Sequence, residues 1–207
     1  MFADRAQIKL MTIHDDRTGQ GENLAFPSMS SCAAVICVLN DRLVGVHKTQ
    51  GAISGRQLRL FNYAKTLIGG EQVHKVVIAG WRAEKGSTVG HAPNEIRKAL
   101  DLPDVATYYL NYATTTHGPK DDSAYKTGFF KTAMTDLCTF AHRNGTDFPM
   151  ITVKRSSKVA NSNIDMNRFK EMGHPFASDI CQFGSLEEDV TASNDHTIGQ
   201  DQFTRLV

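Results

Sequence analysis

Cysteine is scarce in this sequence, and neither sign of charge dominates it. The 207 residues include four cysteines, none of them in a CxxC pair. This count is too low for a disulfide scaffold or for a zinc site built on cysteine pairs, and it suits a reducing compartment. Lysine and arginine number 23 against 22 acidic residues, which gives a formal net charge of +1. The charge balance therefore gives no indication of nucleic acid as a partner.

Long hydrophobic runs are also missing. No stretch approaches the roughly eighteen apolar residues that a membrane helix needs, and the N-terminus lacks the basic start and apolar core of a secretory signal peptide. We therefore expect no membrane span, and a protein that is cytoplasmic or is secreted into a target cell without an ordinary signal peptide. Apolar residues make up 41% and charged residues 22% of the chain, which is typical of a globular protein rather than a disordered one.

Patterns typical of strands and helices alternate along the chain. Apolar residues that alternate or run together predict strands, and apolar residues three and four positions apart predict helices. Residues 15–23 are rich in turn formers and are expected to form a loop. The expected strands are 7–14, 32–39, 43–47, 73–81, 105–112 and 150–154, and the expected helices are 56–67, 94–100 and 126–142.

This order of elements predicts an α/β fold, a single-domain layered sandwich in which a mixed β-sheet packs against helices. No proline- or glycine-rich linker divides the chain, so the domain is expected to span residues 1–184. Residues 185–207 are polar and acidic, with few large apolar side chains. We expect them to form a tail that is loosely packed or partly disordered.

One predicted hairpin brings a cysteine close to a histidine. If Asn40 and Asp41 are the two central residues of its turn, paired residues sum to 81, and His47 lies opposite Ala34. Cys32 is then the diagonal neighbour of His47 on the same face of the sheet. Diagonal Cβ atoms lie about 7–8 Å apart or less, so the imidazole can lean toward the thiol.

A Cys–His pair of this kind suits nucleophilic catalysis. The thiolate is the nucleophile, and a neighbouring imidazole can hold the proton near neutral pH. Cys37 lies an odd number of residues from Cys32, so it faces the other side and is expected in the core. A three-residue turn would rotate His47 away from Cys32 and remove the pair. The alternative interpretation is that Cys32 is a buried thiol and His47 a hydrogen-bonded histidine of the sheet.

The same segment carries a resemblance to a known family. Ser30-Ser31-Cys32, an apolar strand, a polar turn and a glycine-containing strand ending in His47 resemble the cysteine-dependent protein-glutamine deamidases of the chemoreceptor-deamidase and cytotoxic-necrotizing-factor type. The likeness spans residues 26–81. It implies that Cys32 is the nucleophile and His47 the general base. It further implies a bacterial protein, an effector or toxin in one reading, that converts glutamine of a protein substrate to glutamate and ammonia through a thioester.

The sequence departs from the chemoreceptor enzymes at one position. Six residues before the cysteine, those enzymes have a threonine that orients the histidine, and this chain has Phe26 at that position. The third member of the catalytic site is therefore unassigned. Necrotizing-factor toxins are similar in using a main-chain carbonyl for this role, and the loop of residues 23–28 could supply one here. Ser31 and the backbone N–H of Cys32 are candidates for an oxyanion site by their position.

Other motifs are weaker. His14-Asp15-Asp16 lacks a second ligand cluster at a fixed spacing, which favours a solvated turn over a metal site. The glycines of residues 80–86 lack the order of a phosphate-binding loop. Trp81 is expected to anchor the core, or else to line the rim of a substrate site. We expect neither a metal nor an organic cofactor.

Two other functions remain open from the sequence alone. The chain could be a non-catalytic protein-binding adaptor in which Cys32 is structural, or a small-amide thiol hydrolase that uses the same dyad. The leading hypothesis names a protein substrate with a reactive glutamine as the partner and makes no statement about oligomeric state. If that substrate is a folded protein, an exposed and shallow cysteine site is expected.

Overall fold

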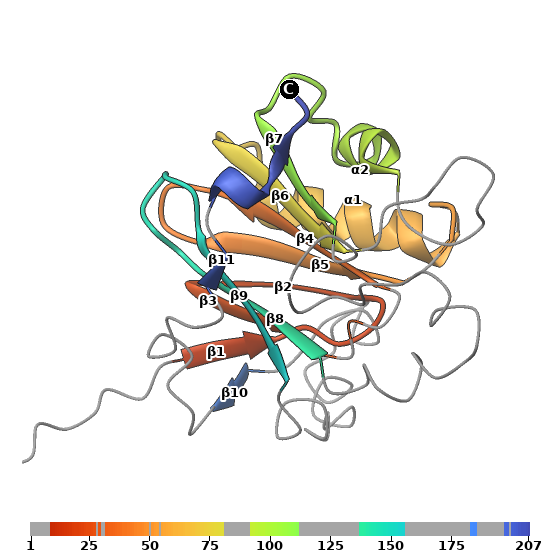
Figure 1. Cartoon of the computed structure of the whole chain (residues 1–207). Helices are drawn as coiled ribbons and strands as arrows, with labels where there is room; N and C mark the ends of the chain where they lie inside the picture. The colour runs from red at the N-terminus through yellow and green to blue at the C-terminus, as the bar shows by residue number, and fades with distance from the viewer. Residues whose placement is uncertain are drawn as a thin grey trace, which may run out of the picture.

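The fold is described from a computed structural model of the whole chain, for residues 9–27, 29, 32–49, 51–53, 55–80, 92–111, 137–155, 183–185, 197–198 and 200–207. These residues form two six-stranded β-sheets and two α-helices (Figure 1). In this described part of the chain, neither helix has the length and apolar character that crossing a membrane requires.

The first sheet, called here the inner sheet, follows the spatial order β12-β7-β6-β4-β5-β2. It is mixed, because β4 pairs antiparallel with both β5 and β6 while β6 and β7 run parallel. Its strands are β2 (Arg17–Gly21), β4 (Ala33–Val38), β5 (Leu43–Lys48), β6 (Lys75–Gly80), β7 (Thr107–Asn111) and β12 (Thr204–Arg205).

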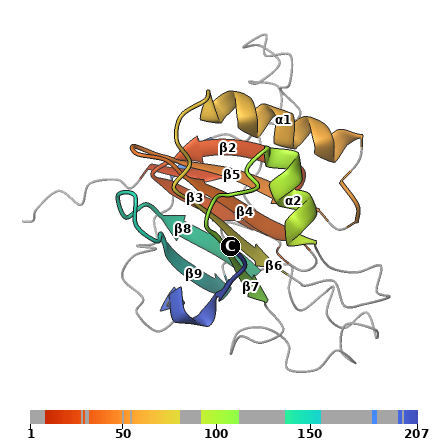
Figure 2. The ribbon, with the colours of Figure 1, turned by 90° about the horizontal axis from the view of Figure 1, so that it is seen from above.

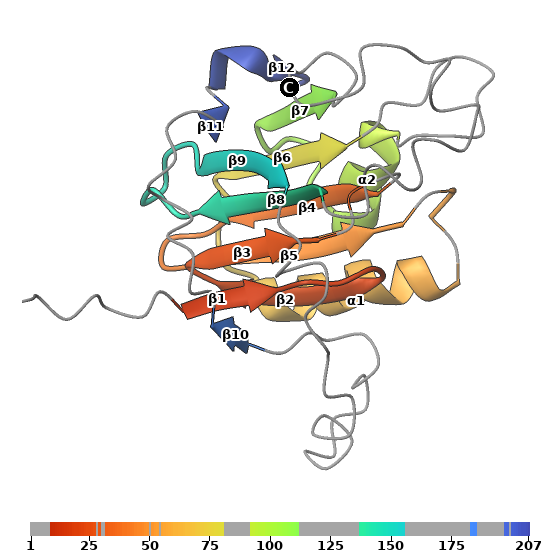
Figure 3. The ribbon, with the colours of Figure 1, turned by 60° about the horizontal axis from the view of Figure 1, so that its bottom comes forward.

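The second sheet, called here the outer sheet, follows the order β10-β1-β3-β8-β9-β11. β1 and β3 run parallel and the other neighbours run antiparallel. Figure 3 shows β1, β3, β8 and β9 side by side in this layer. Its strands are β1 (Lys9–Thr12), β3 (Asn23–Phe26), β8 (Leu137–His142), β9 (Met150–Arg155), β10 (Phe183–Ser185) and β11 (Thr197–Ile198).

The helices α1 (Arg56–Ile68) and α2 (Pro93–Leu100) cover one face of the inner sheet, and the outer sheet lies on its other side (Figure 2). Gly69 ends α1 with a φ of 64°, a left-handed conformation that glycine adopts at little cost. The inner sheet is thus covered on both faces, and its central strand β4 is buried at every residue. Side chains of alternate parity on β4 face the helices and the outer sheet in turn.

The layered α/β fold expected from the sequence is confirmed. The hairpin, the helices near residues 56–67 and 94–100 and the strands near 73–81, 105–112 and 150–154 are all present within a few residues of their expected ends. The outer sheet adds a third layer. Two of its strands, near residues 7–14 and 150–154, are expected from the sequence. No pattern indicated that they form a separate sheet, because β1, β3 and β8 are brought together only by tertiary pairing.

The prediction of a helix over residues 126–142 is wrong for the part of that segment that the structure describes. Residues 137–142 form β8, which pairs with β3 on one side and β9 on the other. A short apolar segment fits a buried strand as well as a buried helix, and here pairing with two strands decides the outcome. Cys138 therefore lies in a strand and not on a helix. The remainder of that expected helix, up to residue 136, lies outside the described residues.

The loop expected over residues 15–23 is also wrong for most of its length. Residues 17–21 form β2 and pair with β5, and residues 23–26 form β3. β2 contains two glycines and little apolar surface, so its own propensity for a strand is low. The ladder to β5 and the hydrogen bond from the buried Thr18 hydroxyl to the Leu60 carbonyl, at 3.3 Å, hold it in the sheet.

The last residues of the chain take part in both sheets. Residues 197–198 pair with β9, and residues 204–205 pair with β7 after the 3₁₀ helix η4 (Gln200–Gln202). Phe203 is buried in the core between the two sheets. Residues 186–196 and 199 of the segment expected to be a loose tail lie outside the described residues.

Candidate active site

The hairpin of β4 and β5 positions Cys32 and His47. Its register pairs Ala34 with His47, and a backbone hydrogen bond of 3.0 Å closes the turn around Asn40 and Asp41. The two-residue turn predicted from the sequence is therefore confirmed, and with it the register. Cys32 stands immediately before β4, diagonal to His47.

Both side chains point from the inner sheet toward the outer sheet. Cys32 is 3% exposed and His47 is 0% exposed, so the shallow, exposed cysteine expected for a folded protein substrate is not observed. Cys37 lies on the opposite face, in the core beneath the helices, as predicted. Burial raises the pKa of the Cys37 thiol to about 12, which leaves this thiol protonated and inert.

A main-chain carbonyl orients the ring of His47. Its Nδ1 lies 2.7 Å from the carbonyl oxygen of Ile13, and because that oxygen can only accept, Nδ1 must be the donor. In the neutral ring the lone pair is therefore on Nε2. The sequence predicts that a main-chain carbonyl of residues 23–28 orients the histidine. This prediction is wrong, because the carbonyl of Ile13 has that role. Phe26 instead packs edge-on against the imidazole, with ring centroids 6.0 Å apart.

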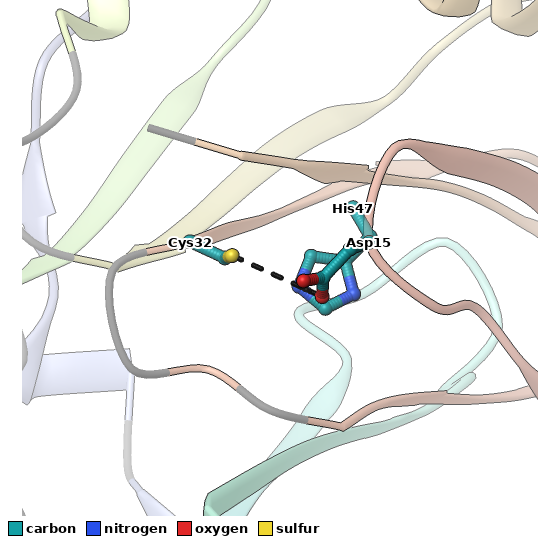
Figure 4. Close-up of side chains that lie close together, drawn as sticks. All are labelled: Asp15, Cys32 and His47. Carbon is teal, nitrogen blue, oxygen red and sulfur yellow. Dashed lines mark hydrogen bonds and ion pairs between the residues drawn. The ribbon is translucent and has the colours of Figure 1, made fainter. Parts of the chain in front are cut away.

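Asp15 is the third side chain of the site, and sequence reasoning missed it. Its Oδ1 lies 3.3 Å from Nε2 of His47 and 4.0 Å from Sγ of Cys32. Figure 4 shows the three side chains converging from three separate segments. Asp15 is 56% exposed, so it forms the solvent side of an otherwise buried site.

A tight crossover between the two sheets brings Asp15 and the Ile13 carbonyl to the same histidine. β1 belongs to the outer sheet and β2 to the inner sheet, so the chain must pass from one to the other between them. Asp16 makes the turn with a φ of 53°, a left-handed conformation that aspartate tolerates. Its backbone N–H donates to the carbonyl oxygen of His47 at 3.0 Å. This bond fastens the crossover to the strand that carries the histidine.

Burial and nearby negative charge shift the pKa of His47 in opposite directions. Burial lowers the pKa of the imidazole, while the nearby Asp15 carboxylate and the Ile13 carbonyl oppose this effect. The net lowering keeps the ring neutral near pH 7, which a base requires. Although Asp15 is within ion-pair distance, Nε2 makes no hydrogen bond within the described part of the chain. Nε2 is therefore a buried acceptor that faces the thiol side of the site.

Lys48 follows His47 on β5, and its side chain faces the helices. Its Nζ donates to the carbonyl oxygens of Thr49 and Gly51, at 3.0 Å and 2.6 Å. Burial lowers the pKa of this ammonium group to about 8, against the opposing effect of nearby acidic groups. The two carbonyl contacts tie down the chain where β5 ends.

Gly45 allows the outer sheet to approach His47 closely. It lies two residues before His47 on β5 and on the same face of the strand. A Cβ built at this position would lie 2.7 Å from Cδ1 of Ile13 and 2.8 Å from both Leu24 Cδ1 and Phe26 Cζ. No side chain fits there, so the bare backbone is what lets the Ile13 carbonyl reach the ring.

Two residues singled out from the sequence lie outside the described residues. They are Ser31, the proposed oxyanion residue, and Trp81, the proposed core anchor or rim residue. The structure therefore places Cys32 and His47 together and leaves these two as predictions. The triplet His14-Asp15-Asp16 stood out in the sequence and includes Asp15. Nothing in the sequence indicates that it lies beside the hairpin, because the crossover between the two sheets brings it there.

The donor atoms of Asp15, Cys32 and His47 all lie within 4.8 Å of one another. A thiol sulfur, an imidazole nitrogen and a carboxylate oxygen so close together can support two kinds of chemistry. One is thiolate catalysis with the histidine as base, and the other is binding of a soft or borderline metal ion.

Comparison with known proteins does not assign the chain to a family. No family model matches the sequence, and no curated protein matches it at a significant level.

Proposed function

We propose that this protein is a cysteine-dependent hydrolase that deamidates glutamine side chains of a protein substrate. One observation carries the proposal. Sγ of Cys32 lies within 4.8 Å of a ring nitrogen of His47 in a buried site, and because the Ile13 carbonyl accepts from Nδ1, Nε2 is the nitrogen left to take a proton. The choice of a glutamine amide as substrate rests on the resemblance of residues 26–81 to the deamidases.

The reaction begins with transfer of the thiol proton from Cys32 to Nε2 of His47. The thiolate then attacks the carboxamide carbon of glutamine and forms a tetrahedral intermediate. As the C–N bond breaks, Nε2 returns its proton to the departing nitrogen, which leaves as ammonia, and a thioester remains on Cys32. Water next gives a proton to Nε2 and adds to the thioester carbon. The C–S bond breaks, the thiol is restored and the product is glutamate.

Asp15 supports the charged stage of this cycle. Once Nε2 has taken a proton, the imidazolium lies 3.3 Å from the Asp15 carboxylate. A negative charge at this distance from a buried cation is favourable, because the surroundings screen it less than water does. Asp15 would therefore stabilise the protonated histidine without taking part in bond making.

Peptide mapping by mass spectrometry tests the proposal. A cell extract is treated with the wild-type protein, with Cys32→Ser or with Cys37→Ala, and glutamine-containing peptides are compared for a gain of about 1 Da that marks conversion of an amide to an acid. The proposal predicts the gain on particular glutamines with wild type and Cys37→Ala, and none with Cys32→Ser. Equal gains with all three proteins would contradict it.

A small amide is the second candidate substrate, and the burial of Cys32 favours it. A thiol that is 3% exposed accepts only a slender group. Ammonia release from free glutamine and from simple primary amides, measured beside release from protein extract, separates the two functions. Faster release from the free amides would favour a small-amide hydrolase.

A further inference from the structure

We infer that Asp15, Cys32 and His47 also form a binding site for one Zn²⁺ ion, and that the ion and the nucleophile exclude each other. This inference goes beyond the hydrolase proposal and does not depend on it, because it concerns binding at three named atoms. Those atoms are Oδ1 of Asp15, Sγ of Cys32 and Nε2 of His47.

The spacing of the three atoms is close to that of a tetrahedral zinc site. With Zn–S near 2.3 Å and Zn–N and Zn–O near 2.0 Å, tetrahedral geometry separates the ligand atoms by about 3.3–3.5 Å. The oxygen and nitrogen are already 3.3 Å apart, and the sulfur is 4.0 Å from the oxygen. The sulfur would move inward by roughly 0.5 Å relative to the oxygen, and its distance to the ligating nitrogen of His47, which is at most 4.8 Å, would shorten to about 3.5 Å. A rotation of one side chain supplies such a shift.

His47 is already oriented as a metal ligand. Metal-binding histidines commonly donate their second ring N–H to a carbonyl or carboxylate, which fixes the tautomer and directs the other nitrogen at the ion. The bond from Nδ1 to the Ile13 carbonyl oxygen, at 2.7 Å, is of this kind. Nε2 is fully buried and has no hydrogen-bond partner in the described part of the chain, so its lone pair could instead coordinate an ion.

The ligand set favours zinc over calcium or magnesium, and the exposed side of the site gives an ion a way in. Sulfur and imidazole nitrogen are ligands of Zn²⁺, whereas Ca²⁺ and Mg²⁺ prefer oxygen throughout. Asp15 is half exposed and lies at the solvent side, so an ion can meet the carboxylate first and then pass to the two buried ligands. Three protein ligands leave a fourth position for water.

Binding removes the nucleophile. When Zn²⁺ replaces the proton on Sγ of Cys32, one proton is released and the sulfur lone pair is held by the metal. Nε2 of His47 is occupied in the same way and can no longer accept a proton. The site can therefore hold an ion or act as a thiol nucleophile, but cannot do both at once.

Cobalt spectroscopy on the full chain tests the site without reference to any enzymatic activity. Reduced protein, stripped with EDTA and dialysed, is titrated with CoCl₂, which takes the place of zinc and shows thiolate-to-cobalt charge-transfer absorption in the near ultraviolet when sulfur is a ligand. We expect the band to saturate at one equivalent in wild type and in Cys37→Ala, and to be missing in Cys32→Ser. Asp15→Asn, at a half-exposed position where the fold should be kept, is expected to weaken binding at least about tenfold.

A second measurement tests the exclusion. One equivalent of ZnCl₂ should slow alkylation of Cys32 by iodoacetamide at least tenfold, and EDTA should restore the original rate. A wild-type protein without a saturable band, a band that survives Cys32→Ser, or an alkylation rate that zinc leaves unchanged would overturn the inference. A normal band in a protein that releases no ammonia would instead contradict only the hydrolase proposal.

Discussion

His47 is the central residue of the site because its two ring nitrogens have different surroundings. Nδ1 is held by the Ile13 carbonyl, while Nε2 faces Asp15 and the thiol of Cys32. The carbonyl fixes which nitrogen is basic, and burial keeps the ring neutral near pH 7. A histidine with a fixed tautomer and an available second nitrogen can serve as a base or as a metal ligand.

At the residue scale, Asp15→Asn is expected to weaken catalysis without unfolding the protein. Loss of the carboxylate removes a charge that favours the imidazolium, so the pKa of His47 falls further. Because a weaker base stays deprotonated to lower pH, the acidic limb of the kcat/KM profile for ammonia release should move to lower pH. The maximum rate should fall on the order of tenfold, because a weaker base accepts the thiol proton less readily.

The matching control is Asp41→Asn, in the hairpin turn at the far end of the same strands. Its carboxylate is 71% exposed and pairs with Arg42 at the surface, where an ion pair contributes little. The variant should keep the wild-type pH profile. If Asp15→Asn did the same, Asp15 would have no part in the reaction.

At the scale of elements, the site depends on two connections of different kinds. The β4–β5 hairpin is local, and its two-residue turn fixes the register by itself, so the sequence was sufficient to predict the Cys32/His47 pair. The crossover from β1 to β2 is not local, because its place is set by the packing of one sheet on the other. Asp15 and the Ile13 carbonyl reach the site through that packing, and no spacing in the sequence indicates it.

The close approach at Gly45 leads to a prediction for this element. Gly45→Ala should destabilise the fold by about 1–3 kcal/mol, the usual cost of overpacking, because the added methyl would meet Ile13, Leu24 and Phe26 at under 3 Å. It should also displace the Ile13 carbonyl from His47 and reduce ammonia release. Urea denaturation and activity measured on the same preparation check both effects.

Gly21→Ala is the control for this variant. Gly21 lies at the end of β2, and a Cβ there would have its nearest contacts at 3.6 Å, an ordinary van der Waals distance. Its stability should change by less than about 0.5 kcal/mol. If both variants lost a similar amount of stability, close packing beside His47 would not be the reason that Gly45 is necessary.

At the scale of the whole molecule, the inner sheet is covered by helices on one face and by the outer sheet on the other. Local periodicity was enough to predict the α/β class and most elements near the hairpin. It failed for β2, β3 and β8. β2 pairs with β5, and β3 pairs with β8, across long stretches of sequence, while β8 also pairs with its neighbour β9. The layer that completes the active site is thus the part that local patterns indicate least.

The C-terminal residues give a prediction at this scale. Phe203 is 7% exposed and packs edge-on against Phe148, with ring centroids 4.9 Å apart. Phe203→Ala should therefore lower the free energy of unfolding by about 3 kcal/mol, as measured by urea denaturation. Val207→Ala, at an exposed position, should change it by less than about 0.5 kcal/mol. Equal stability of both variants would mean that the C-terminal segment is not part of the core.

The central claim is that His47 makes Cys32 a nucleophile, and the pH dependence of cysteine alkylation tests it most directly. Cys32 and Cys37 are almost equally buried, at 3% and 1% exposed. Cys37 is therefore an internal reference for the labelling rate of a buried thiol in the same protein. Burial raises the pKa of Cys37 to about 12, and at pH 8 only about one Cys37 thiol in ten thousand is therefore ionised.

The experiment follows iodoacetamide labelling of each cysteine by peptide mass spectrometry between pH 5 and pH 10, about the range in which free thiols begin to ionise, with EDTA present. The account predicts that Cys32 of the native protein is labelled far faster than Cys37, with a midpoint below the free-thiol value of about 8.5. It also predicts that His47→Gln moves this midpoint upward while the fold is retained. Labelling of Cys32 as slow as that of Cys37, or a profile that His47→Gln leaves unchanged, would contradict the account.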